Sequence, residues 1–135
     1  MTIKPSIAVI DDDASVRDAT TGLLRSQGFI AKGFASAKEF MESNRALITS
    51  CLIADVQMPG LSGLALYGQL LAAGRPVPTI LITAYPDEAI RERALSAGVA
   101  AYLPKPFTGE QLLDCIDAAL KHTVALAPVK PSPRA

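Results

Sequence analysis

Five short apolar runs, separated by segments with helical periodicity, set the strongest limit on how this chain can fold. All five are rich in Ile, Val, Leu and Ala. They lie at residues 6–10, 30–34, 51–54, 79–83 and 101–103. The first, third and fourth runs are almost entirely apolar, which is typical of parallel strands covered by helices on both faces. Strands that alternate with helices in this way predict an α/β fold built on a parallel sheet.

The segments between these runs carry apolar residues at the 3.6-residue period of a helix. The expected inward faces are Val16, Ala19, Leu23 and Leu24, then Leu64, Tyr67, Leu70 and Leu71, and later Leu112, Leu113, Ile116 and Leu120. Gly28, Gly74 and Gly98 fall just past three of these segments, where a left-handed C-terminal cap is favoured. Residues 37–43 predict only a short helix, because the segment that follows is polar and turn-like. We therefore expect a doubly wound five-stranded sheet.

The size and composition of the chain favour a single domain. Its 135 residues are half apolar, enough for one well-formed core. No apolar run approaches the roughly 20 residues that span a bilayer, and the first residues lack the apolar segment of a secretion signal. We expect a soluble, cytoplasmic domain over residues 1–123. The Pro-rich residues 124–135 should form a flexible tail or the stump of a linker.

Charge and cysteine content exclude several classes of function. Thirteen basic residues balance thirteen acidic ones, and no basic stripe with interleaved aromatic residues is present. We therefore expect no direct contact with nucleic acid. Cys51 and Cys115 stand far apart in the sequence and form no C-x-x-C motif, which favours reduced thiols over a disulfide or a zinc site. His122, the single histidine, is not expected to have a catalytic role.

Polar and charged residues follow the ends of the predicted strands. These residues are Asp11, Asp12, Asp55, Thr83 and Lys105. In doubly wound folds, ligands bind beyond the carboxyl ends of the strands. Two carboxylates about 4 Å apart repel by roughly 1 kcal/mol in water and by roughly 4 kcal/mol at the effective dielectric of a protein surface. The adjacent aspartates therefore predict a bound cation, although a helix cap with solvated neighbours would also account for them.

Four motifs, "VIDDD", "LIADVQMPGLSG", "ILITAY" and "YLPKPF", occur in this order along the chain. Together they resemble a response-regulator receiver domain of the CheY-like superfamily, over about residues 7–121. The pattern is most similar to receivers of the FixJ/NarL type, which precede helix-turn-helix DNA-binding domains. The resemblance implies a flavodoxin-like sheet with strand order 2-1-3-4-5 and helices on both faces. It also implies a signalling switch in a two-component system, not a metabolic enzyme.

The resemblance implies a role for each residue of the acidic edge. Asp55 would be the phosphoacceptor, receiving a phosphoryl group from a histidine kinase or phosphotransfer protein. Asp12, Asp55 and the backbone carbonyl of Gln57 would hold Mg²⁺, with Asp11 acting through water. Gln57 stands where many members carry Arg, Met or Asn, a difference expected to affect only the dephosphorylation rate. Gly63, in the turn that follows, is expected at a positive φ.

Lys105 and Thr83 would each contact a phosphoryl oxygen, and the peptide bond before Pro106 would be cis. Movement of Thr83 would let Tyr102 rotate from exposed to buried. This change would alter the surface formed by the fourth helix, fifth strand and fifth helix. A downstream protein or effector domain would read that surface, and phosphorylation could promote a homodimer through it.

Two other functions fit parts of the pattern. A haloacid-dehalogenase-like phosphohydrolase would use Asp11 as its nucleophile, together with Thr, Lys and Mg²⁺. Such an enzyme needs further acids in a loop after the lysine, whereas Asp114 and Asp117 lie within a predicted helix. The second alternative is an interaction module that works without phosphorylation. The presence of every acidic and switch residue argues against it.

Overall fold

The computed structural model describes residues 4–126 and contains a parallel sheet of five strands. The strands are β1 (Ser6–Ile10), β2 (Ile30–Phe34), β3 (Cys51–Asp55), β4 (Thr79–Thr83) and β5 (Ala101–Pro104). Their order across the sheet is β2-β1-β3-β4-β5, and every neighbouring pair is parallel. This order confirms the predicted doubly wound topology, including the reversal of strand order between β1 and β3.

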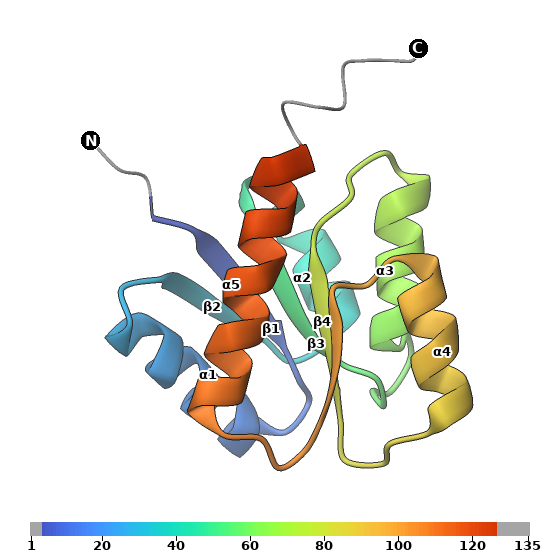
Figure 1. Cartoon of the computed structure of the whole chain (residues 1–135), viewed down its shortest axis with the longest axis horizontal. Coiled ribbons are helices and arrows are strands. Elements are labelled where there is room, and N and C mark those ends of the chain that lie inside the picture. The colour runs from blue at the N-terminus through green and yellow to red at the C-terminus, as the bar shows by residue number, and fades with distance from the viewer. Residues whose placement is uncertain (1–3, 127–135) are drawn as a thin grey trace.

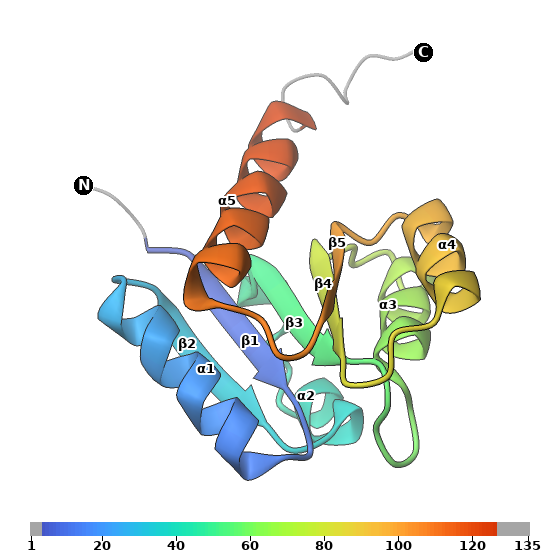
Figure 2. The same cartoon turned by 60° about the horizontal axis from the view of Figure 1, so that its bottom comes forward.

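Helices cover both faces of this sheet (Figure 1). They are α1 (Ala14–Ser26), α2 (Ala37–Glu42), α3 (Gly63–Ala72), α4 (Glu88–Ala97) and α5 (Gly109–Leu126), with a short 3₁₀ turn η1 (Ala46–Ile48) before β3. One face carries α1 and α5, and the other carries α2, α3 and α4 (Figures 1 and 2). Within residues 4–126, no helix combines the length and apolar character needed to cross a membrane.

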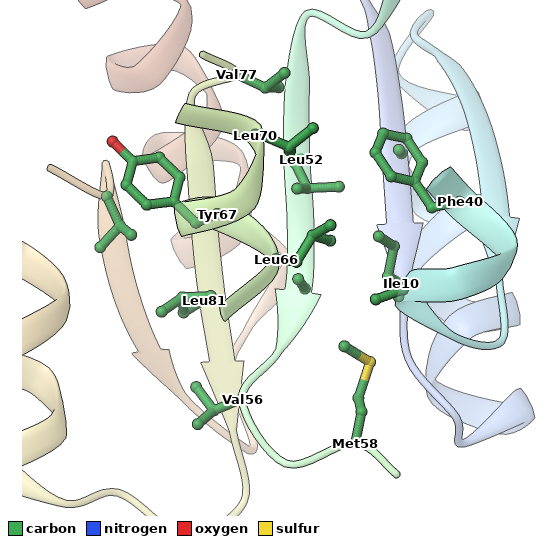
Figure 3. Packing of buried hydrophobic residues seen from close by; sticks show 14 of the residues in the cluster. Ile10, Phe40, Leu52, Val56, Met58, Leu66, Tyr67, Leu70, Val77 and Leu81 are labelled. Atoms are coloured by element: carbon green, nitrogen blue, oxygen red, sulfur yellow. The ribbon is translucent and has the colours of Figure 1, made fainter. Parts of the chain in front are cut away.

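Alternate residues of the central strands supply two separate hydrophobic cores, because successive side chains of a strand point to opposite faces. Leu52 and Ala54 pack under α2 and α3, whereas Cys51 and Ile53 pack under α1 and α5. All five residues of β3 are buried, as are all five of β4. Figure 3 shows the first core, in which the loop residue Met58 also takes part. The apolar character of these strands follows from burial on both faces.

Side-chain caps define where most of the helices begin. Asp13 accepts hydrogen bonds from the backbone N–H groups of Ser15 and Val16 at the start of α1. Asp87 caps α4 in the same way. Such caps satisfy backbone donors that have no partner within the helix. The cap at Asp13 confirms the simplest interpretation of that residue and leaves Asp11 and Asp12 as the unexplained carboxylates.

Two predicted inward faces are wrong in part. Ala19 is exposed, and the neighbouring Thr20 is buried in its place. Leu71 is 41% exposed, whereas Leu66 is fully buried. In both helices the packing contact selects a face slightly rotated from the one that apolar residues alone suggest.

The prediction for Gly63 is also wrong, because it is Gly60 that has a positive φ, of 82°. Gly63 is the first residue of α3, at a position where there is no room for a side chain. A Cβ there would lie 2.6 Å from the carbonyl oxygen of Asp55. Gly28, Gly74 and Gly98 do adopt positive φ after their helices, as predicted.

The C-terminal boundary differs from the expected one. Helix α5 continues to Leu126, so residues 124–126 belong to it. The rest of the predicted tail, 127–135, lies outside the described residues, as does the side chain of His122.

Candidate functional site

The predicted site residues meet at the carboxyl edge of the sheet. Asp11 follows β1, Asp55 ends β3, Thr83 ends β4 and Lys105 follows β5. The parallel register aligns these ends, with Ile10 opposite Ala54 and Asp55 opposite Ile82. Figure 2 shows the β1 and β3 arrowheads at this edge. Residues as far apart in sequence as Asp11 and Lys105 therefore share one site.

The ammonium group of Lys105 joins the two buried carboxylates. Its Nζ lies 2.7 Å from Asp55 Oδ2 and 3.0 Å from Asp11 Oδ2. The Asp11 side chain has no exposed area, and that of Asp55 is 7% exposed. Charge-assisted hydrogen bonds of this kind are among the strongest in proteins. They hold the lysine against the two carboxylates, at the position where it would meet an incoming anion.

The ionisation of Asp55 and Lys105 reflects this burial and pairing. Burial raises the pKa of Asp55, and the hydrogen bonds from Lys105 and from the Gln57 backbone offset only part of that rise. For Lys105, burial lowers the pKa, but hydrogen bonds to Asp55 and Asp11 outweigh it, so the pKa ends above its ordinary value. Lys105 is therefore a cation at neutral pH. The Asp55 carboxylate is more basic than a solvated one, which favours its use as a nucleophile.

Backbone hydrogen bonds fix the second oxygen of each buried carboxylate. Asp11 Oδ1 accepts from the N–H of Asp13 at 2.9 Å, and Asp55 Oδ1 accepts from the N–H of Gln57 at 2.8 Å. The Asp11 carbonyl also accepts a 2.8 Å hydrogen bond from Arg17 Nη1. Gly33 makes room for Arg17, since a Cβ at that position would lie 2.9 Å from Arg17 Cγ. These contacts orient the acidic loop.

Asp12 completes a donor set that fits a hard divalent cation. Asp11, Asp12 and Asp55 each offer an oxygen within 4.8 Å of the other two, and no other cluster of this kind occurs within residues 4–126. Asp12 is exposed. One lysine cannot neutralise three carboxylates, so the site keeps excess negative charge. Carboxylate oxygens with access to water are the ligands that Mg²⁺ prefers.

Thr83 is fully buried, and its hydroxyl makes two hydrogen bonds. It donates to Gln57 Oε1 at 2.6 Å and accepts from the N–H of Tyr85 at 2.9 Å. The sequence predicted only a backbone contribution of Gln57 to the metal site and gave no sign of this side-chain contact. No local pattern could have found it, because the two residues come together only when β3 and β4 pair.

Tyr102 lies at the other end of the predicted switch and is half-buried. Its hydroxyl accepts a 3.0 Å hydrogen bond from the N–H of Asp87, the residue that caps α4. The sequence predicted Tyr102 as a switch residue but did not reveal this contact. The peptide bond between Lys105 and Pro106 is cis, as predicted. The strand and the helix beside it are thus connected through one phenol oxygen.

The sequence that forms this site matches a known family. Residues 7–117 match the family described as "Response regulator receiver domain". The chain belongs to this family. Receiver domains bind Mg²⁺ at an acidic pocket, and the cluster of Asp11, Asp12 and Asp55 corresponds to such a pocket. Response regulators interact with histidine kinases and with effector domains.

Individual relatives agree with this assignment. The receiver is 40% identical over 119 residues to nodulation protein W of Bradyrhizobium diazoefficiens, covering 88% of this chain and 52% of the relative. It is 36% identical over 122 residues to the transcriptional regulatory protein FixJ of the same organism, covering 90% and 60%. The solved structure of the response regulator StyR superposes with a TM-score of 0.85 at 40% identity, covering 96% of this chain and 65% of that one. The receiver thus spans a little over half the length of these two curated relatives.

The acids that a phosphohydrolase would need lie elsewhere. Asp114 and Asp117 are both exposed on α5, and Asp117 pairs with Lys121 at 3.0 Å. Neither residue belongs to the acidic cluster of the receiver. The geometry therefore favours the receiver over the alternative in which Asp11 is the nucleophile.

Proposed function

We propose that this receiver is a phosphorylation-dependent switch whose phosphoacceptor is Asp55. The observation that carries the proposal is the position of Lys105, bound to both Asp55 and Asp11 beside the exposed Asp12. The proposal is supported by the presence, within one cluster, of a buried carboxylate that could act as a nucleophile, a fixed cation and carboxylates that could bind a divalent metal. Phosphoryl transfer needs little more than alignment and charge neutralisation, which such a group can supply.

In the proposed reaction, a carboxylate oxygen of Asp55 attacks the phosphorus of a phosphohistidine on a sensor kinase or phosphotransfer protein. A P–O bond forms as the P–N bond breaks, and the imidazole nitrogen leaves with the bonding pair. Lys105 exchanges its contact with Asp55 for one with a phosphoryl oxygen. Asp11, Asp12, Asp55 and the Gln57 carbonyl would hold Mg²⁺, which neutralises charge on the phosphoryl group.

The output of the switch follows from the remaining residues. The Thr83 hydroxyl donates to a second phosphoryl oxygen, and Tyr102 moves inward from its position beside Asp87. The surface of α4, β5 and α5 changes as a result and is read by an effector domain or a downstream protein. We also propose that phosphorylation promotes homodimerisation through this surface and that the receiver acts in the cytoplasm. The receiver assists only its own phosphorylation and dephosphorylation.

Mass spectrometry of the intact protein tests the phosphoacceptor. Incubation with acetyl phosphate and Mg²⁺ should add one phosphoryl group, which should be lost in Asp55→Asn and retained in Asp11→Asn. Loss only in Asp11→Asn would favour the phosphohydrolase instead. If neither a small donor nor the cognate kinase gives an adduct, the chain works as an interaction module without phosphorylation.

A further inference from the structure

The hydrogen bonds of the Thr83 hydroxyl limit what this residue can do in the resting protein. A hydroxyl group has a single proton, and that of Thr83 is directed at Gln57 Oε1, 2.6 Å away. The hydroxyl oxygen of Thr83 already accepts a hydrogen bond from the N–H of Tyr85. A hydroxyl has one O–H donor, so it makes one strong hydrogen bond to a single acceptor or weaker bonds to two acceptors at once. While the bond to Gln57 lasts, Thr83 has no proton to offer a phosphoryl oxygen on Asp55.

Gln57 is placed to respond to events at Asp55. Its backbone N–H donates to Asp55 Oδ1, while its side chain reaches the hydroxyl of Thr83. One residue therefore contacts both the proposed phosphoacceptor and the proposed switch threonine. Gln57 is otherwise exposed, so its amide can exchange Thr83 for water without creating a buried, unpaired group.

The orientation of the Gln57 amide follows from matching each hydrogen-bond donor around Thr83 to an acceptor. If the amide NH₂ faced Thr83, both it and the Tyr85 N–H would donate to the same hydroxyl, and the Thr83 proton would lack this acceptor. With Oε1 facing Thr83, each of the three groups is satisfied. Within residues 4–126, no buried side-chain nitrogen or oxygen lacks a partner. The Gln57–Thr83 bond is thus a defined part of the resting structure.

We propose that Gln57 is a positioning residue that holds Thr83 in its resting orientation and so opposes activation. This inference rests on the proposed role of Thr83 in binding the phosphoryl group. Each activation event must exchange the bond to Gln57 for one to the phosphoryl oxygen. A neutral hydrogen bond between protein groups changes an equilibrium by a factor of about 2 to 12. Removing the Gln57 acceptor should therefore favour the activated state by a factor in that range.

The experiment is a double-mutant cycle with beryllofluoride and Mg²⁺ as the phosphoryl mimic. Gln57→Met keeps the length of the side chain but removes the acceptor, and Thr83→Val removes the proton. Gln57→Met should bind the mimic about 2- to 12-fold more tightly than the wild type. In the Thr83→Val background, the same change at Gln57 should leave the affinity unaltered. Gln57→Glu, which retains an acceptor, should not reproduce the tightening.

The resting protein offers a second readout that does not depend on binding. Three-bond couplings to the Thr83 methyl group report the rotamer of its side chain. We expect one rotamer in the wild type, rotamer averaging in Gln57→Met and a shift of the Tyr85 amide resonance. In urea unfolding, Gln57→Met without the mimic should be destabilised by a comparable factor of about 2 to 12 in the folding equilibrium, because the bond it loses is the one that opposes activation.

Equal changes in affinity in both backgrounds, or an unchanged Thr83 rotamer in Gln57→Met, would overturn the positioning role. Failure of the wild type to form any adduct at Asp55 would instead overturn the proposed function. The two failures are therefore distinguishable.

Discussion

At the scale of single residues, the molecule depends on one lysine shared between two buried carboxylates. Lys105 contacts Asp11 and Asp55, whereas the pair formed by Lys121 and Asp117 lies largely in solvent. Removing one partner of a buried ion pair leaves an uncompensated charge, but a solvated pair contributes little. The two lysines therefore form a matched comparison within one chain.

Lys105→Met should lower the free energy of unfolding by about 2–4 kcal/mol in buffer without divalent metal, because Asp11 and Asp55 lose their common partner. Lys121→Met should change it by less than about 0.5 kcal/mol. Urea unfolding followed by circular dichroism measures both. Equal effects of the two substitutions would show that the Lys105 contacts do not stabilise the fold.

The buried thiol of Cys51 should make the folded protein less stable at alkaline pH. Burial raises the pKa of its thiol from 9.0 to about 12. Between these values the unfolded chain loses a proton that the folded protein keeps, so stability falls as pH rises. From pH 8 to pH 10 the wild type should lose about 1 kcal/mol more than Cys51→Ala. Urea unfolding at both pH values gives the difference, and parallel losses would mean that the buried thiol is not the cause.

The acidic site could be predicted from the sequence because strand ends are easy to recognise. Asp11, Asp55, Thr83 and Lys105 each stand where an apolar run stops, and parallel pairing brings such positions together. The Gln57–Thr83 and Tyr102–Asp87 contacts could not be predicted. Each joins residues from neighbouring elements through a flexible or rotatable side chain, and its geometry depends on distances that no sequence pattern records.

At the scale of elements, the buried faces of the helices show how well a pattern of apolar residues predicts which side of a helix packs inward. Thr20 and Thr21 are buried in α1 although they are polar, and Leu71 of α3 is exposed although it is apolar. The sheet surface against which a helix packs decides its inward face, and small polar residues fit that surface when their hydroxyls find partners. Thr21 does so by donating to the carbonyl of Asp18. Hydropathy alone therefore misplaces a face by one position.

Two glycines of α3 make a paired test of close packing. Gly63→Ala would place its Cβ 2.6 Å from the Asp55 carbonyl oxygen and 2.9 Å from Leu81 Cδ2, whereas Gly68→Ala meets no atom within 4 Å. We expect Gly63→Ala to destabilise the fold by about 1–3 kcal/mol. Gly68→Ala should stabilise it by about 0.5–1 kcal/mol, because alanine favours the helix. Thermal unfolding of both variants measures the contrast, and stabilisation by both would refute the steric account of Gly63.

At the scale of the whole molecule, the sheet joins two cores that share no side chain. Because β3 is buried along its full length, Asp55 is held between the two layers of helices. The doubly wound layers could be predicted from five apolar runs joined by right-handed crossovers, and the strand order from the resemblance to receiver domains. The end of α5 could not, because an apolar stretch such as "VAL" continues a helix without any marked periodicity.

Mg²⁺ should stabilise the whole domain, because the proposed site exists only where folding brings Asp11, Asp12 and Asp55 together. At ten times its dissociation constant, a ligand specific for the folded state adds about 1.4 kcal/mol. The measurement is the midpoint of urea unfolding with and without Mg²⁺. Asp12→Asn should lose most of the effect, and Asp114→Asn, which alters an exposed acid of α5, should keep it. An equal response of both variants would exclude the acidic site as the place of binding.

The contact between Tyr102 and Asp87 has a consequence for the start of α4. The phenol oxygen is the acceptor for the amide of the residue that caps this helix. If the Tyr102 ring turns inward, the N–H of Asp87 loses this acceptor and can donate to water or to the main chain of a binding partner instead. A chemical change at Asp55, the last residue of β3, would then expose an unpaired backbone donor at the start of α4. Another polypeptide can recognise this donor without any change in the helix itself.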